Sequence, residues 1–167
     1  MNRFMIVVNP DKDTDSTVTN RIQSYLEAHG AACMVRDVFH LESSDWEALK
    51  KEQFDCVLVL GGDGTLLRMA GETEDIDIPL FGINLGTVGF LTEGEVANIE
   101  EILDRLLTDD FTIEERMMVT GTVTKADGTT YRKSALNDIV ISRAGFSRLI
   151  GLNVSVDGQV LDTYEAD

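Results

Sequence analysis

The sequence predicts an α/β protein, in which an open, mostly parallel sheet with flanking helices is followed by the start of an antiparallel β-sandwich-type domain. Short apolar runs alternate with segments of helical periodicity as far as residue 107, which is typical of a parallel sheet. Farther on, apolar and polar residues alternate singly, and Asp-Gly pairs at 127–128 and 157–158 indicate hairpin turns. We therefore expect an α/β domain over residues 1–112 and a partial antiparallel β domain over residues 113–167.

Strands and helices alternate in the first part of the chain. Apolar runs predict strands at residues 4–8, 32–35 and 56–60, and another that begins at residue 78. Apolar residues at helical spacing predict helices that begin near residues 18, 44, 65 and 98. This order is that of a Rossmann-like sheet, in which ligands bind at the carboxyl ends of the strands.

The composition limits the classes of partner. The 167 residues carry a formal net charge of −16, which argues against binding to nucleic acid or to an anionic membrane surface. No apolar run is long enough to cross a membrane. Cys33 and Cys56 lie in predicted strands, which suits a reducing compartment, and neither they nor His29 and His40 have the spacing of a metal site.

The sequence Gly-Gly-Asp-Gly-Thr at residues 61–65 lies where the third predicted strand turns into a helix. Glycines there let a ligand approach bare backbone, and the amides of the turn and of the helix start form an anion site. A carboxylate is a poor neighbour for a phosphate unless it holds Mg²⁺ or accepts a proton. Asp63 therefore indicates a phosphoryl-transfer site. The alternative is a tight turn in which Asp63 only caps the helix.

Two further stretches carry candidate binding residues. Residues 82–92 form a second glycine-rich loop, in which Phe90 is either a core residue or a platform for a flat ring. Asn137 and Asp138 precede the apolar stretch 139–141, which we expect to be a strand. The pair either forms the turn before that strand or reads ribose hydroxyls or an adenine edge.

Two common nucleotide-binding signatures are missing, namely the P-loop and the Gly-x-Gly-x-x-Gly fingerprint after the first strand. The chain instead resembles the NAD kinase family over essentially its whole length, in residues 61–66, 82–92 and 136–141, which occur in family order. The first stretch is also similar to one in diacylglycerol and sphingosine kinases and in phosphofructokinases, whereas the second is specific.

The resemblance implies roles for individual residues. Asp63 matches the catalytic acid that takes the proton of the adenosine ribose 2′-hydroxyl, and Phe90 lies where the family stacks an adenine. Asn137 and Asp138 match an Asn–acidic pair, although Asp is shorter than the commoner Glu. Glu165 replaces a basic residue often found at its position, and we assign it no phosphate role. The other matched contact positions are Gly64, Arg68, Arg148 and Asp167.

The resemblance also implies an activity, which is the conversion of NAD to NADP with Mg²⁺ and with ATP or polyphosphate as donor, by a homo-oligomer in the cytoplasm. The sequence stops just before the Thr-Pro-Thr-Gly-Ser-Thr-Ala-Tyr segment with which the family binds NAD, so we expect little kinase activity from this chain alone. One rival is a lipid kinase of the same Gly-Gly-Asp-Gly class, which no amphipathic or basic membrane-facing segment supports. The other is a non-catalytic nucleotide-binding module.

Overall fold

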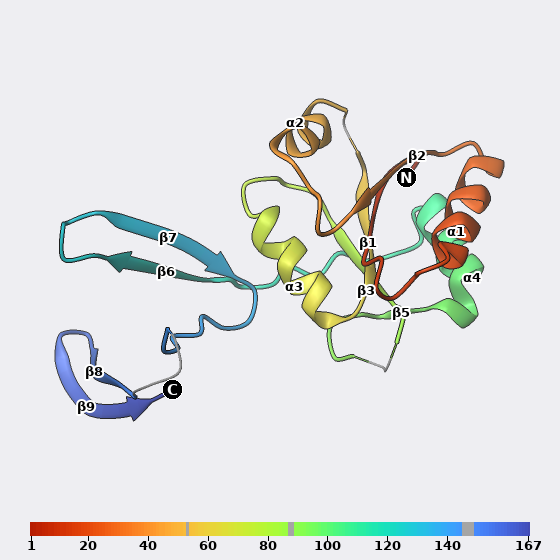
Figure 1. Cartoon of the computed structure of the whole chain (residues 1–167). Coiled ribbons are helices and arrows are strands. Elements are labelled where there is room, and N and C mark those ends of the chain that lie inside the picture. The colour runs from red at the N-terminus through yellow and green to blue at the C-terminus, as the bar shows by residue number, and fades with distance from the viewer. Residues whose placement is uncertain (53, 87–88, 145–148) are drawn as a thin grey trace. The chain divides into compact units, whose positions relative to one another are not determined.

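The structure is a computed structural model that describes residues 1–52, 54–86, 89–144 and 149–167 (Figure 1). The described elements are, in chain order, β1 (Arg3–Val8), α1 (Thr17–Ala28), β2 (Ala32–Asp37), α2 (Ser43–Glu52), β3 (Cys56–Gly61), α3 (Asp63–Glu72), β4 (Leu80–Asn84), β5 (Gly94–Glu95), the 3₁₀ helix η1 (Val96–Asn98), α4 (Ile99–Leu107), β6 (Val119–Thr124), β7 (Thr130–Ala135), β8 (Ile150–Val156) and β9 (Gln159–Ala166).

Five parallel strands form the central sheet, in the order β2-β1-β3-β4-β5. The carboxyl ends of β1 and β3 are neighbours, and the amide of Asn9 donates to the Leu60 carbonyl at 2.8 Å. The predicted α/β architecture with a parallel sheet is thereby confirmed. The two-residue strand β5 was not foreseen, because so short a run carries no hydrophobic pattern.

Helices cover both faces of this sheet, so the central strands are buried on both sides. In β3, Leu58 and Leu60 pack into one core with apolar residues of α1 and α4, while Val57 and Val59 pack into a second core with residues of α2 and α3. All six residues of β3 are buried. This two-sided burial explains why the strand reads as a continuous apolar run instead of an alternating one.

Two antiparallel hairpins make up the rest of the described secondary structure. β6 pairs with β7, and β8 pairs with β9. Asp157 and Gly158 both have positive φ, 50° and 79°, as a tight hairpin turn requires. The antiparallel pairs predicted around the two Asp-Gly sequences are confirmed.

The chain forms two compact units, residues 1–137 and residues 138–167. The first unit includes the β6–β7 hairpin, in which the Ser134 carbonyl oxygen lies 3.5 Å from where a Cβ on Gly71 of α3 would be. The boundary predicted between residues 112 and 113 marks the change from parallel to antiparallel structure, and as a domain boundary it stays a prediction.

The strand expected at residues 139–141 is absent. Residues 138–144 have no regular secondary structure, and Val140 is 75% exposed. No described strand pairs with this stretch, so it lacks the hydrogen-bond ladder that would make it a strand, whatever its apolar composition. Within the described residues, no helix has both the length and the apolar character to cross a membrane.

Candidate functional site

The Gly-Gly-Asp-Gly turn lies at the carboxyl edge of the parallel sheet. β3 ends at Gly61 and α3 begins at Asp63, with extended Gly62 as its N-cap. A Cβ at Gly61 would collide with the Thr65 side chain, so the turn needs glycine at that position. The Leu85 amide donates to the Gly61 carbonyl at 2.8 Å, which attaches the second glycine-rich loop to the turn.

The Asp63 carboxylate bonds to the second glycine-rich loop. Its Oδ2 accepts a hydrogen bond from the Phe90 amide at 2.8 Å, and its Oδ1 accepts bonds from the Leu91 and Thr92 amides at 3.1 and 3.2 Å. The Thr92 hydroxyl donates to Oδ1 as well, at 3.3 Å. No side chain caps α3 through a hydrogen bond, so the interpretation of Asp63 as a mere helix cap is wrong.

These hydrogen bonds set the charge state of Asp63. The Phe90 amide bond lowers the pKa of the carboxyl group, partial burial raises it, and the bonds from Leu91 and Thr92 lower it further, with a net decrease. Asp63 is therefore ionised at neutral pH. Oδ2 accepts one of the hydrogen bonds and Oδ1 accepts three, so Oδ2 has the greater capacity left for a ligand proton.

The backbone amide of Phe90 donates a hydrogen bond to Asp63, while the Phe90 side chain extends into solvent. The phenyl group is 100% exposed, so the interpretation of Phe90 as a core residue is wrong. The neighbouring Leu91 is half-buried and packs with the core under α2 and α3. An exposed ring on a loop whose next residue is held in the core can offer a face to a flat ligand, and the role in adenine stacking stays a prediction.

Asn137 and Leu91 line one surface hollow of about 320 Å³. The glycine-rich loop of residues 82–92 and the stretch that contains Asn137 therefore line the same hollow in the first unit. The backbone amide of Leu91 also donates a hydrogen bond to Asp63. Asn137 itself is an exposed residue. Leu136, the first residue of the matched stretch 136–141, lines the hollow as well. The remaining lining residues, which sequence reasoning did not identify, are Glu114, Glu115, Arg116 and Met117. The only sequence signal for these four was the change of pattern after residue 110.

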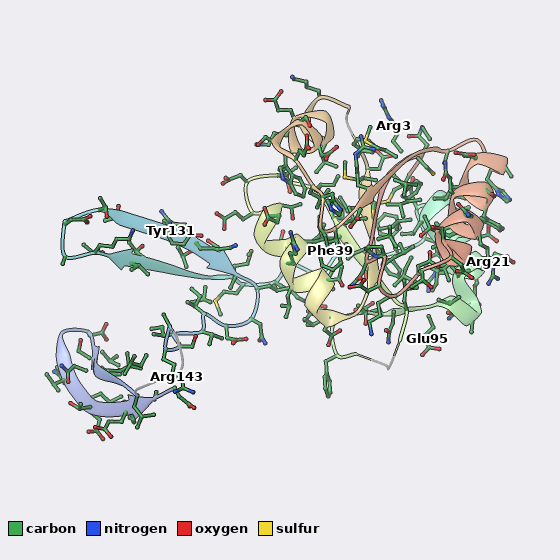
Figure 2. All side chains as sticks on the ribbon, in the orientation of Figure 1. Arg3, Arg21, Phe39, Glu95, Tyr131 and Arg143 are labelled. Atoms are coloured by element: carbon green, nitrogen blue, oxygen red, sulfur yellow. The ribbon has the colours of Figure 1, made fainter. Side chains whose placement is uncertain are left out.

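A second hollow, of about 360 Å³, lies at the carboxyl ends of β1 and β4 and is lined in part by Lys12, Asn84 and Glu95 (Glu95 is labelled in Figure 2). A Cβ on Gly86 would lie 3.8 Å from Lys12 Nζ and 4.0 Å from Asn84 Oδ1. Lys12 thus places a cation near the loop that bonds Asp63. Sequence reasoning missed Lys12, because a lysine in a polar loop carries no signal of its own.

Gly64 and Arg68 both lie exposed on α3. Apart from its chain neighbours and the backbone of α3, no atom of the described residues lies within 4 Å of where a Cβ on Gly64 would be, so space there is open to a ligand. The Arg68 guanidinium carbon lies 5.8 Å from the ring centroid of Phe39, which is labelled in Figure 2. This cation–π contact leaves Arg68 at the surface, where its predicted phosphate contact stays a prediction.

The other predicted contact residues lie outside the first unit. Asp138 and Asp167 are exposed residues of the second unit, and Glu165 is an exposed residue of β9. Arg148 lies outside the described residues. The predicted roles of Asp138, Arg148 and Asp167 stay predictions, and Glu165 has no assigned role.

Among the described residues, no three His, Cys, Asp or Glu side chains are grouped so that they could hold a metal ion. The Asp63 oxygens already accept four hydrogen bonds between them. The described side chains thus do not fit a Mg²⁺ site built from protein ligands alone.

Residues 4–111 match the family model of the ATP-NAD kinase N-terminal domain. The chain is 40% identical over 171 residues to the NAD kinase of Lachnoclostridium phytofermentans, covering 100% of this chain and 60% of that protein. It is 39% identical over 172 residues to the NAD kinase of Lachnospira eligens, covering 100% and 59%. The chain spans about 60% of the length of these curated relatives.

A solved structure with the same fold is that of yeast NADH kinase complexed with NADH. It matches with a TM-score of 0.77 and 17% identity, over 100% of this chain and 56% of that one. At that identity the match supports the fold, and it agrees with the parallel sheet and antiparallel pairs described above.

Proposed function

Because the chain belongs to the ATP-NAD kinase family, we propose that it acts in the phosphorylation of the adenosine ribose 2′-hydroxyl of NAD, with ATP or polyphosphate as donor and NADP as product. One observation carries the proposal. An ionised carboxylate, Asp63, lies at the carboxyl edge of the parallel sheet, within the glycine-rich turn, and is oriented by four hydrogen bonds.

The proposed reaction forms a bond between the ribose 2′-oxygen and the terminal phosphorus of the donor, and breaks the bond from that phosphorus to the bridging oxygen. ADP, or polyphosphate shorter by one unit, leaves with the bonding electrons. The hydroxyl proton passes to Asp63, and we assign it to Oδ2, which has the greater acceptor capacity left. The lowered pKa makes Asp63 a weak base in the ground state, so the proton moves as the new bond makes the hydroxyl acidic.

The other contacts follow the predicted pattern. We assign the exposed Phe90 ring to the adenine and the Asn137 amide to the ribose or adenine edge, because Leu91, the residue after Phe90, lines the same hollow as Asn137. Gly64 and Arg68 are assigned to phosphate groups. The assignments of Asp138, Arg148 and Asp167 to NAD rest on the resemblance of the sequence motifs.

Mg²⁺ accompanies the phosphate groups of the donor in this proposal, where it would neutralise their charge. Since no group of protein ligands for it exists among the described residues, we derive no step from it.

We also propose a homo-oligomer in the cytoplasm. The exposed apolar residues of the second hairpin, such as Val160 at 82%, are compatible with a subunit contact, and light scattering at several concentrations tests the oligomer.

The test of the proposal is Asp63→Asn in a chimera, in which this chain replaces the matched stretch of the Lachnoclostridium phytofermentans relative. Asn keeps the size of Asp but cannot accept the proton, so we expect kcat to fall by about 10²–10⁴. We expect the affinity for NAD, measured by isothermal titration, to stay within about threefold, a small change on the scale of a lost hydrogen bond.

Asp75→Asn is the matched control, because Asp75 is an exposed carboxylate just beyond α3. It should leave kcat unchanged. A kcat of Asp63→Asn within about threefold of the parent, short of the range for a lost base, would refute the proposal.

We further expect the isolated 167-residue chain to turn over more slowly than about 1 s⁻¹, the low end of ordinary enzyme rates. Binding of NAD by the chimera with no turnover would instead indicate a non-catalytic module.

A further inference from the structure

Gly89 lies directly against the Asp63 carboxylate. A Cβ at position 89 would lie 2.6 Å from Asp63 Cγ and 2.9 Å from Oδ2, and closer still to Oδ1. All three atoms of the carboxylate would thus be in collision with any side chain at this position. We propose that Gly89 is a positioning residue for Asp63 in phosphoryl transfer, because its missing side chain leaves the space in which the carboxylate lies. The inference rests on the proposed function of Asp63.

Space is what distinguishes Gly89 from the glycines that permit a turn. The described glycines with positive φ are Gly30, Gly128 and Gly158. Beyond its chain neighbours, a Cβ on any of these three would meet no described atom within 4 Å, whereas the space beside Gly89 is filled by the Asp63 carboxylate.

The Oδ1 atom of Asp63 accepts two hydrogen bonds from Thr92, which is only 8% exposed. Thr92 is itself seated by a second glycine, since a Cβ on Gly82 of β4 would lie 2.9 Å from Thr92 Cγ2 and 3.2 Å from its Cα. The contact with Gly82 of β4 therefore fixes the position of Thr92, which donates hydrogen bonds to Oδ1. Gly89 leaves the space that the carboxylate occupies. If the carboxylate were displaced, it would lose several of its four hydrogen bonds at once.

Gly89→Ala is expected to displace the carboxylate from its amide donors. In the chimera, kcat should fall by about 10²-fold, the cost of a misplacement of about 1 Å, with the KM for NAD within about threefold. In the isolated chain, the titration of Asp63 followed by carboxyl ¹³C NMR should move to higher pH. The bonds from the Phe90, Leu91 and Thr92 amides hold its pKa down, and losing them raises it.

Gly71→Ala is the matched control. Gly71 lies in the same helix as Asp63. Among the described residues outside this helix, a Cβ there would meet only the Ser134 carbonyl oxygen, at an ordinary 3.5 Å. It should leave both the Asp63 titration and kcat at the parent values.

Thr92→Ser and Thr92→Val provide a second test that does not depend on how Gly89→Ala folds. Serine keeps the hydroxyl that donates to Oδ1 and should titrate and turn over like the parent. Valine keeps the shape and loses the hydroxyl, so its Asp63 titration should move to higher pH and its kcat should fall by about 2- to 10-fold.

The results separate this inference from the proposed function. If Asp63→Asn is inactive while Gly89→Ala matches the parent in kcat and in the Asp63 titration, the inference is overturned and the proposed function stands. If Gly89→Ala does not fold, equal behaviour of Thr92→Val and Thr92→Ser in both readouts overturns it. A parental kcat of Asp63→Asn would overturn the proposed function instead. Loss of kcat in Gly89→Ala, together with a raised Asp63 titration, supports the inference.

Discussion

β3 and β9 are two strands of this chain in opposite environments. Every residue of β3 is buried, between helices on both faces of the parallel sheet. All but one residue of β9 are exposed, including Val160 at 82% and Leu161 at 63%. The parallel sheet and its helices thus bury the apolar side chains of β3, whereas the apolar side chains of β9 in the second hairpin are exposed to solvent.

The difference bears on the residues that we propose for catalysis and for NAD binding. The base proposed here, Asp63, belongs to the self-sufficient unit and is oriented entirely by residues of that unit. Several proposed NAD contacts, such as Asp138 and Asp167, belong to the exposed unit. A two-stranded hairpin is only marginally stable by itself. The NAD contacts proposed in the second unit therefore require that its hairpin pack against other structure, whereas the contacts proposed in the first unit do not.

Thiol reactivity gives the largest contrast between the regions. Burial, and then the charge of Asp55, raises the pKa of Cys56 in β3 to about 12, and burial raises that of Cys33 in β2 to about 11. Both thiols stay protonated at pH 8. A cysteine introduced by Val160→Cys has no such burial, so a thiol there should have an ordinary pKa near 9.0. Because the thiolate is the nucleophile, it should react about 10³-fold faster than Cys56.

The measurement is the rate of modification by Ellman's reagent of the folded chain at pH 8, with the urea-unfolded chain as reference. Cys33 should react before Cys56, since it lies in the edge strand and is only half-buried. Equal rates for Cys56 and Val160→Cys would show that the central sheet opens as readily as the hairpin, which would remove the contrast between the regions.

Stability should show the same contrast. Leu58 is 0% exposed at the centre of β3, so Leu58→Ala should lower the free energy of unfolding by about 2–5 kcal/mol. Val160→Ala removes an exposed side chain and should change it by no more than about 0.5 kcal/mol. Urea unfolding followed by far-UV circular dichroism, which reports on both units, and by fluorescence of Trp46, which packs against the core of α2 and α3, measures both. A cost at Val160 equal to that at Leu58 would mean that the hairpin is covered in solution.

The parts that the sequence predicted are those with local signals. An apolar run between polar residues and glycines located β3 and its turn, and Asp-Gly pairs located the hairpins, because neighbouring residues decide these features. The bonds of Asp63 to residues 90–92 join loops far apart in sequence, so only the order of strands brings them together. The stretch 139–141 failed as a strand for the same reason, since pairing, not composition, makes a strand.

The smallest expected effect lies at the junction of the two regions. Asn137 is the last residue of the first unit, exposed at a hollow that it shares with Leu91. Its amide can donate and accept at once, which suits a ribose or adenine edge. In the chimera, Asn137→Ala should weaken NAD binding by about 1–3 kcal/mol, the cost of an unpaired group in a desolvated site, and weaken ATP binding less.

Isothermal titration with each nucleotide measures the two affinities, and Asn20→Ala, at an exposed position of α1, is the matched control. The difference between NAD and ATP is what decides the role of Asn137. A residue that only shapes the backbone after β7 would disturb the hollow for both nucleotides alike, whereas one that reads NAD affects mainly that ligand. Equal losses for NAD and ATP would therefore assign Asn137 to the fold, and would leave NAD recognition in the first unit to the residues around Asp63 and Phe90.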